Sequence, residues 1–289
     1  MSRLQEALNN GKFVVTSEIG PPKGTDIYRI LEENDVLKTR VDAINVTDLQ
    51  SSVMRLGSLV TCKLLLDRGI EPVYQLTCRD RNRLALQSDL LSAAVFGIEN
   101  CLILTGDYPT LGDHPEAKAV FDLDSLQLLQ AVRSLESGVD MAGKKLSGAP
   151  RFFKGAVVNP GADPLEPELI KMEKKVKAGA QFFQTQAVFD IEKFKLFIEK
   201  TKYLNVPVMA GIVLLKSAGM ANFMNKNVPG VNVPDSFIKK MEVSTDKVAT
   251  SVEIASSLIK GIKPFCQGVH IMPIGWDRYV VKVLDAAGL

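Results

Sequence analysis

The stretch PVYQLTCRDRNRLALQSDLLSAAVFGIENCLILTGD, residues 72–107, contains the pattern that decides the fold. It begins with an apolar run, Pro72–Thr77, continues through an amphipathic segment near Asp80–Phe96, and ends in a second apolar run, Cys101–Thr105. Short apolar runs of this kind are typical of strands buried on both faces, and the segment between them is long enough for a crossover helix. The stretch therefore predicts a β–α–β unit with parallel strands.

The same alternation recurs on both sides of this unit. Six further strand-like runs are expected at Lys12–Glu18, Val41–Thr47, Phe153–Val158, Gln181–Gln186, Pro207–Leu214 and Gly268–Met272. Amphipathic segments are expected near Thr25–Thr39, Arg55–Arg68, Ser125–Ser134, Glu166–Ala178, Ile191–Lys200 and Asp277–Ala286, with further helical material between the seventh run and Ile262. Eight strand–helix units in 289 residues predict a single (β/α)₈ TIM barrel in the α/β class rather than an open doubly wound sheet.

One domain is expected to cover residues 1–289, because no linker or low-complexity segment interrupts the alternation. The turn Ile19–Pro22 contains two prolines and lacks the glycine fingerprint that cradles a dinucleotide pyrophosphate. Net charge is +2 and aromatic residues make up 7% of the chain, which gives no basic stripe for nucleic acid. The composition therefore favours a globular enzyme or small-molecule binder over a nucleic-acid-binding protein.

The amino terminus and the cysteines indicate the cellular compartment of the protein. Residues 1–10 are predicted to form a short polar helix without the apolar core of a signal peptide, and no later run approaches the length of a membrane span. The four cysteines form no CxxC pair, and each lies in an apolar stretch. We expect them to be buried free thiols in a cytoplasmic protein.

Polar residues interrupt the apolar runs where the predicted strands end. In a barrel of this kind the active site lies at the carboxyl ends of the strands. The residues concerned are Ser17, Glu18, Asn45, Thr47, Asp48, Gln75, Thr77, Thr105, Gly106, Asp107, Asn159, Gln184 and Gln186. They predict a mouth lined with carboxylates, amides and hydroxyls. Each also has a structural alternative: a carboxylate can cap a helix or pair with a lysine, and one of the two glutamines can point away from the barrel axis.

Other reaction types find little support in the sequence. The chain has two histidines, His114 in a loop and His270 within the last strand, and no clustered cysteines, so we expect no catalytic metal. His270 is interpreted as a hydrogen-bonded core histidine rather than a ligand. No Ser-His-Asp or Cys-His arrangement predicts a covalent acyl intermediate. Lys171–Lys177 is interpreted as a solvated helix face, with Lys174 or Lys175 meeting a phosphate as the functional alternative.

Five segments in register resemble the methylenetetrahydrofolate reductase family over nearly the whole chain. They are Ser17–Pro22 (SEIGPP), Asn45–Thr47 (NVT), Gln75–Cys78 (QLTC), Leu104–Asp107 (LTGD) and Lys175–Ala180 (KVKAGA), the last running on to Gln186 and Phe189-Asp190. No single tetrapeptide among them is specific to the family, but their order and spacing together are.

The resemblance implies a flavin held at the barrel mouth, with a folate substrate stacked on its ring. FAD is the expected cofactor, and FMN remains an alternative. The family pattern assigns Glu18 the role of general acid, Asp107 a position near the flavin pyrimidine edge and the substrate, and Gln186 a hydrogen bond to the pterin. The expected flavin contacts are Thr47, Gln75, Thr77, Thr105, Gly106, Asp107, Asn159 and Lys175, with Thr47 also beside the substrate.

The chemistry of this reaction suits the residue types. The five-membered ring of methylenetetrahydrofolate must open before hydride arrives, and protonating its N10 expels the amine and leaves an iminium cation at N5. Burial of Glu18 beside Ile19 and Pro21 would favour the neutral acid that supplies this proton. An ionised Asp107 would stabilise the cation. The flavin performs the hydride transfer, while the protein orients and polarises the substrate.

The sequence departs from the family pattern at three places. Gln75 and Thr105 stand where family members carry a histidine and an arginine that touch the flavin, so the phosphate or ribityl contacts must differ. After the seventh run, Leu215–Met220 (LKSAGM) offers no aromatic ring for a nicotinamide to stack on, although Phe223 lies close in sequence. The electron donor is therefore either NAD(P)H or an iron–sulfur partner subunit, and we expect an oligomer.

Three other functions remain open on the sequence alone. A different flavin barrel, such as a proline-dehydrogenase-like oxidase, would need arginines for a substrate carboxylate, and only Arg278 lies near the last strand. A pterin-binding methyltransferase barrel would bind the same ligand without flavin. A non-catalytic scaffold subunit would keep the fold alone, which the joint presence of Glu18, Asp107 and Gln186 disfavours.

Overall fold

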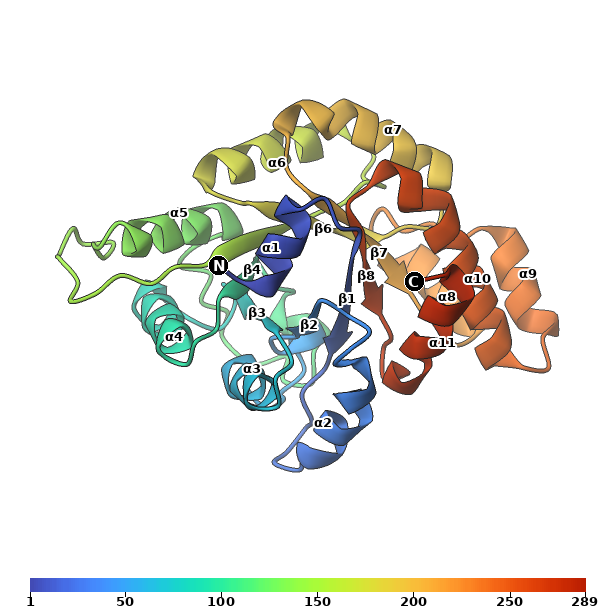
Figure 1. Ribbon diagram of the computed structural model, residues 1–289, viewed down its shortest axis with the longest axis horizontal. Helices are drawn as coiled ribbons and strands as arrows, with labels where there is room; N and C mark the ends of the chain where they lie inside the picture. The colour runs from blue at the N-terminus through green and yellow to red at the C-terminus, as the bar shows by residue number, and fades with distance from the viewer.

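A closed barrel of eight parallel strands, paired in sequence order, forms the centre of the molecule (Figure 1). The computed structural model describes all residues from Met1 to Leu289. The strands are β1 (Val14–Ile19), β2 (Ala43–Val46), β3 (Pro72–Thr77), β4 (Asn100–Leu104), β5 (Phe153–Val158), β6 (Phe182–Ala187), β7 (Val208–Val213) and β8 (Gly268–Met272). Pairing of β8 with β1, in which Thr16 lies opposite His270, closes the barrel. The predicted fold class is therefore confirmed.

Helices surround the barrel and connect successive strands. Those that follow β1 to β6 are α2 (Tyr28–Asn34), α3 (Ser58–Asp67), α4 (Arg83–Val95), α5 (Ser125–Glu136), α6 (Glu166–Ala178) and α7 (Ile191–Thr201). Three helices follow β7, namely α8 (Ala218–Asn227), α9 (Asp235–Val243) and α10 (Lys247–Ile262), and α11 (Val280–Ala287) follows β8. The helix predicted over Thr25–Thr39 is shorter than expected, because it changes to a 3₁₀ turn at Asp35–Leu37.

Side-chain caps fix where several of these helices begin. Asp124 accepts from the backbone N–H of Gln127, whose side chain accepts in return from the Asp124 N–H, a capping box that starts α5. Asn82 caps α4 and Asp190 caps α7 in the same acceptor role. Asn82 and Asp190 lie a few residues after the ends of β3 and β6, so these two caps also fix the lengths of short loops at the barrel mouth.

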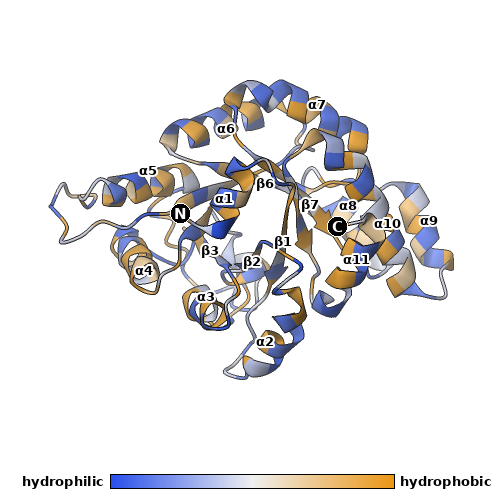
Figure 2. Cartoon of the chain, in the orientation of Figure 1, coloured by the Kyte–Doolittle hydropathy of each residue, from blue (hydrophilic) through white to orange (hydrophobic).

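Two hydrophobic cores stabilise the fold. The larger one lies between the strands and the surrounding helices, and Figure 2 shows the helices striped, with apolar and polar residues alternating around each. The smaller one fills the amino-terminal half of the barrel interior, where Phe153 and Phe182 stack with ring centroids 4.7 Å apart. Gly155 leaves room for this stack, because an added Cβ would come within 2.2 Å of the Phe182 ring.

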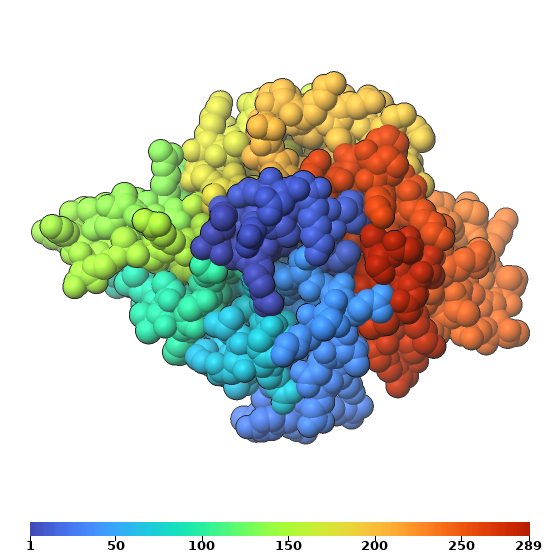
Figure 3. All heavy atoms as spheres, in the orientation of Figure 1, coloured from blue at the N-terminus to red at the C-terminus, as the bar shows by residue number.

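A short helix, α1 (Arg3–Asn9), closes the amino-terminal end of the barrel. Its Leu4 and Leu8 are buried in the inner core, and Figure 3 shows the helix lying across the centre of that face. The Glu71 carboxylate, which precedes β3, accepts from the backbone N–H of Arg3 at 3.0 Å and of Leu4 at 2.9 Å. The expectation of a simply polar helix was therefore wrong, since two leucines one helical turn apart give it an apolar face.

The four cysteines are buried and unpaired, as the sequence indicated. Burial raises the pKa of the Cys78 and Cys101 thiols to about 12, so both remain protonated at neutral pH. None of the helices combines the length and apolarity that a bilayer crossing requires.

Candidate active site

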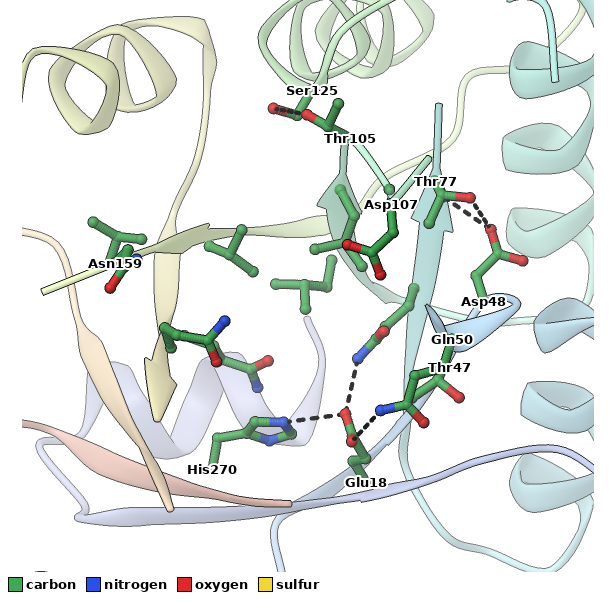
Figure 4. Close-up of a pocket in the computed structure, with 18 of the residues that line it drawn as sticks. Glu18, Thr47, Asp48, Gln50, Thr77, Thr105, Asp107, Ser125, Asn159 and His270 are labelled. Carbon is green, nitrogen blue, oxygen red and sulfur yellow. Dashed lines mark hydrogen bonds and ion pairs between the residues drawn. The ribbon is translucent and has the colours of Figure 1, made fainter. Parts of the chain in front are cut away.

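A cavity of about 390 Å³ opens at the carboxyl ends of the strands, within the range typical of small-molecule sites. Its lining includes every residue that the sequence singled out for catalysis or ligand binding (Figure 4). These residues are Glu18, Thr47, Gln75, Thr77, Thr105, Gly106, Asp107, Asn159, Lys175 and Gln186. The geometry brings them together, while their individual roles remain predictions.

Glu18, near the end of β1, is a buried carboxylate of the cavity and is 8% exposed. Three donors from different elements surround it. Gln50 Nε2 lies 3.4 Å from Oε1, Gln75 Nε2 lies 3.5 Å from Oε2, and His270 Nε2 lies 3.5 Å from Oε2. All three contacts are long for hydrogen bonds, as catalytic contacts often are without a ligand. The carboxylate is thus held from three sides while it faces the cavity (Figure 4).

A layer of buried polar side chains lies on the barrel-interior side of Glu18. His270 Nδ1 is 3.0 Å from Thr16 Oγ1, and Gln184 Nε2 donates to the same oxygen at 3.3 Å. Gln184 and Asn45 exchange amide hydrogen bonds of 2.7 and 3.2 Å. Because four strands contribute one residue each to this layer, barrel closure itself assembles it.

The end of β4 forms one side of the mouth. Gly106 has φ of +93°, and a Cβ there would approach the Cβ atoms of Arg79 and Thr77 to 3.1 and 3.2 Å, so this close turn favours glycine. Asp107 follows it and is exposed, and its carboxylate accepts no hydrogen bond from the chain. Figure 4 shows the carboxylates of Asp107 and Glu18 pointing toward the same central space.

Arg79 holds the loop after β2 against the loop after β4. Its guanidinium is buried; Nη1 donates to Ser52 Oγ at 3.0 Å and the Asp107 carbonyl at 3.3 Å, and Nη2 donates to the Leu49 carbonyl at 3.2 Å. The remaining donors reach Asp80. Within the β2 loop, Leu49, Ser51 and Ser52 have φ of 49°, 55° and 59°, a strained conformation for residues other than glycine. The loop that carries Gln50 therefore depends on Arg79 for its shape.

Asp48 also lines the cavity, but its carboxylate is engaged within the chain. Its buried carboxylate accepts from the Thr77 N–H at 2.9 Å, from the Thr77 hydroxyl at 2.8 Å, and from two nitrogens of Arg81 at 2.8 and 3.1 Å. Thr77 lines the cavity, but its hydroxyl proton is engaged in this way. A flavin contact from Thr77 would therefore come from its methyl group or from the second lone pair of its oxygen.

Lys175, on α6, is a second buried cation of the cavity lining, in addition to Arg79. Its ammonium donates to the Val157 carbonyl at 2.7 Å, which leaves two of its three N–H bonds for other partners. Burial lowers its pKa, an effect that the nearby Glu168 carboxylate opposes. Asn159, at the end of β5, uses its side chain to brace the loop at Pro229 and Gly161. Lys175 thus offers the cation that a phosphate would meet, whereas the Asn159 amide is already engaged.

Gln184, Thr185 and Gln186 all line the cavity, although alternation along a strand would send Thr185 to the face opposite the two glutamines. A register shift in the pairing of β6 with β7 between Gln184 and Ala187 breaks the alternation here. Gln186 Oε1 accepts from the N–H of Ala187 at 3.0 Å, which leaves its amide N–H₂ facing the cavity. Neither glutamine points away from the axis.

No phenylalanine, tyrosine or tryptophan lines the cavity. The segment after β7 places Leu215 in the core and uses Ser217 to cap α8, so none of its residues reaches the cavity. Phe223 lies on α8 with 62% of its surface exposed and is also absent from the lining. The cavity lining thus contains no aromatic side chain from the segment after the seventh strand.

Sequence comparison decides the family. A family model described as methylenetetrahydrofolate reductase matches residues 3–288. The chain belongs to this family. Among curated relatives, methylenetetrahydrofolate reductase 2 of Schizosaccharomyces pombe is 25% identical over 309 residues, covering 99% of this chain and 47% of its own. The 5,10-methylenetetrahydrofolate reductase of Pectobacterium carotovorum is 26% identical, covering 72% of this chain and 68% of its own.

The chain spans about half the length of several family members, 47% of the S. pombe protein and 50% of methylenetetrahydrofolate reductase (NADH) 1 of Zea mays. Among solved structures, an uncharacterized protein from Clostridium thermocellum that binds two copies of 5-methyl-5,6,7,8-tetrahydrofolic acid superposes with a TM-score of 0.71. It is 18% identical and covers 99% of this chain and 98% of its own. This likeness supports the fold.

The cavity residues that the sequence reasoning did not assign to it include His270, Arg79 and Gln50. His270 is buried and hydrogen-bonded as expected, but it also lines the cavity beside Glu18. The signal was available, because a histidine in the last strand of a barrel lies next to the first strand. Arg79 and Gln50 lie in loops whose conformations no short pattern specifies, and for them the sequence held no comparable signal.

Proposed function

We propose that this protein reduces 5,10-methylenetetrahydrofolate to 5-methyltetrahydrofolate with a bound flavin. The observation that carries the proposal is the meeting of Glu18, Asp107 and Gln186 at one cavity of a barrel that belongs to this family. These are the proton donor, the anionic stabiliser and the pterin partner that the reaction requires. The activity makes the chain an oxidoreductase acting on a CH–NH group.

The lining of the cavity fits a flavin in chemical character. Leu102, Leu104 and Val157 supply apolar surface of the kind that packs against an isoalloxazine ring. Thr105, whose hydroxyl donates to Ser125 Oγ at 3.2 Å, and Gln75 supply polar groups for its edge or ribityl chain. Lys175 supplies the cation for a phosphate. We favour FAD over FMN on family membership, and both carry a phosphate that Lys175 can meet.

The residues of the chain divide the remaining work. Glu18 delivers a proton to N10 of the folate, which opens the five-membered ring. The exposed Asp107 carboxylate, free of partners within the chain, stabilises the cation that forms at N5. The Gln186 amide holds the pterin edge, and Arg79 keeps the Asp107 loop in place. The flavin, when bound, supplies the hydride.

The electron donor, in this proposal, is a partner protein rather than a nicotinamide. A nicotinamide that reduces a flavin must stack on its ring, and an aromatic side chain usually supports that stack. This cavity has no Phe, Tyr or Trp in its lining. An iron–sulfur subunit needs no such stack, because electrons can pass to the flavin edge. The proposal also predicts an assembly of more than one subunit, whose existence size measurement of the native complex would test.

Two half-reactions test the proposal. The purified chain is titrated with FAD and with FMN, and the loaded protein is reduced by an artificial low-potential donor and then mixed with methylenetetrahydrofolate. We expect flavin binding, rapid folate-dependent reoxidation, and weak or absent bleaching by NADH or NADPH. Failure to bind either flavin at high micromolar protein would refute the redox function. Rapid bleaching by NADH would refute the partner-donor proposal alone.

A flavin-free pterin methyltransferase is the second candidate for the same cavity. It would share Gln186 and Asp107 as pterin contacts and would need no cation for a phosphate. Binding of 5-methyltetrahydrofolate by a chain that takes up no flavin would favour it. Lys175 with its two unused N–H bonds is the feature that supports the flavin enzyme instead.

A further inference from the structure

His270 has no part in the proposed reaction as described so far, yet it is a buried group beside the carboxylate on which that reaction depends. It lies on β8, is 3% exposed, and places Nε2 3.5 Å from Glu18 Oε2. Of the other two donors around Glu18, Gln50 is exposed in a strained loop and Gln75 lies on β3. His270 is thus the partner whose own position is fixed from within the barrel.

The hydrogen-bond layer around Thr16 determines which imidazole nitrogen carries the proton. Gln184 Nε2 has two hydrogens, and they are directed to Thr16 Oγ1 at 3.3 Å and Asn45 Oδ1 at 3.2 Å. Thr16 Oγ1 is therefore an acceptor toward Gln184 and keeps its own hydrogen to donate. Its acceptors are His270 Nδ1 at 3.0 Å and the Val269 carbonyl at 3.5 Å.

The contact with Nδ1 is the shorter of the two, and we assign the Thr16 hydrogen to it. Thr16 donates to Nδ1, so Nδ1 is bare, and a neutral imidazole must then carry its hydrogen on Nε2. That hydrogen faces Glu18 Oε2. The layer of Asn45, Gln184 and Thr16 thus aims one N–H at the carboxylate.

We propose that His270 is a positioning residue that acts as the neutral Nε2–H tautomer, holding the Glu18 side chain toward the cavity and stabilising its carboxylate after proton delivery. The inference rests on the proposed function for its kinetic part but not for the tautomer. A hydrogen bond to an ionised acceptor is stronger than one between neutral groups, so His270 favours the product of proton transfer. The only charged group that faces the imidazole in this layer is Glu18.

Nitrogen NMR on the ligand-free chain tests the tautomer directly. The chain contains only two histidines, so ¹⁵N-imidazole labelling gives two spin systems, assigned by their loss in His270→Gln and His114→Asn. At about pH 8.5, above the ordinary titration range of histidine, we expect bare Nδ1 and protonated Nε2 for His270. Thr16→Val should weaken this preference and leave the exposed His114 unchanged. Protonated Nδ1 in the parent would overturn the proposal, because Thr16 would then accept from Nδ1 and donate to the Val269 carbonyl instead.

A matched pair of substitutions tests the positioning role. Glutamine places its amide near the position of Nε2 and can still donate to Glu18, whereas asparagine reaches only the position of Nδ1. On flavin-loaded protein we expect His270→Gln to keep the folate half-reaction within about 5-fold and His270→Asn to lose about 10- to 100-fold, the worth of one hydrogen bond to a charged group. Both variants should bind and reduce flavin like the parent. Equal losses in the two would overturn the role.

The two measurements separate this inference from the proposed function. If the parent reduces no folate at all, the proposed function fails and the tautomer alone decides the inference. If the parent reduces folate but carries its proton on Nδ1, the inference fails while the function stands.

Discussion

Replacing Arg79 with leucine is expected to destabilise the protein and loosen the mouth of the barrel. The guanidinium makes three hydrogen bonds to groups in two loops, at 3.0, 3.3 and 3.2 Å, and is itself 2% exposed. At about 1 kcal/mol each, their loss amounts to about 3 kcal/mol. The ion pair with Asp80 adds little, because the Asp80 side chain is 33% exposed. A chain of this size would melt about 6 °C lower.

Calorimetry and flavin titration together measure this effect. Arg79 contacts both Leu49 and Ser52 in the strained part of the β2 loop, so flavin affinity should fall with the melting temperature. Arg79→Lys should not rescue either quantity, because an ammonium cannot span the acceptors that the planar guanidinium reaches. Arg83→Leu is the matched control, since Arg83 pairs with Asp122 at the surface and contacts no cavity residue. Equal melting shifts in Arg79→Leu and Arg83→Leu would refute the reasoning.

Four further outcomes are expected. Glu18→Gln should leave flavin binding and reduction intact but slow the folate half-reaction at least ~100-fold; near-parent folate turnover would place the acid elsewhere. Asp107→Asn should shift the flavin midpoint potential and lower folate turnover together, and an unchanged potential would contradict the assignment. Burial lowers the pKa of Lys175, so its charge is present below that pKa and lost above it. Flavin affinity should therefore fall as the pH rises through this pKa. A Lys175→Met variant whose flavin affinity keeps the same pH profile would exclude a phosphate contact. Leu4→Ala should cost about 2–5 kcal/mol of stability, measured by urea unfolding, and normal stability would contradict its role in closing the barrel.

The strands could be predicted closely because burial on both faces leaves a plain apolar signature. Pro72–Thr77 and Phe153–Val158 begin and end where the sequence indicated. The starts of α5, α6 and α7 were also predicted correctly, whereas other helix starts were less accurate, since they depend on caps and loop contacts. The helix after β3 begins at Arg83 rather than Asp80, because Asp80 is held by Arg79 in the loop and Asn82 supplies the cap.

The cavity lining was predictable for a related reason, since polar residues at the ends of parallel strands converge on one rim. The contacts that could not be predicted depend on the closure of the barrel and on positive φ values in the loop after β2. Thr16 and His270 are 254 positions apart and become neighbours only through the register of β1 with β8. Gln50 reaches Glu18 only because its loop adopts positive φ values at Leu49 and Ser51.

Helix α1 closes the amino-terminal end of the barrel, so the cavity is open at the carboxyl-terminal end. Leu4 and Leu8 exclude solvent at the amino-terminal end of the barrel. Water and buffer therefore reach Glu18 through the cavity at the carboxyl ends of the strands. In the proposed reaction, the flavin and the folate fill that opening. The number of protons in the closed cavity is then fixed until a product leaves. The protonation state that matters for each turnover is then the one set when the substrate bound. The rate of the buried proton transfer should accordingly be independent of buffer concentration, and label from deuterated water should enter only between turnovers.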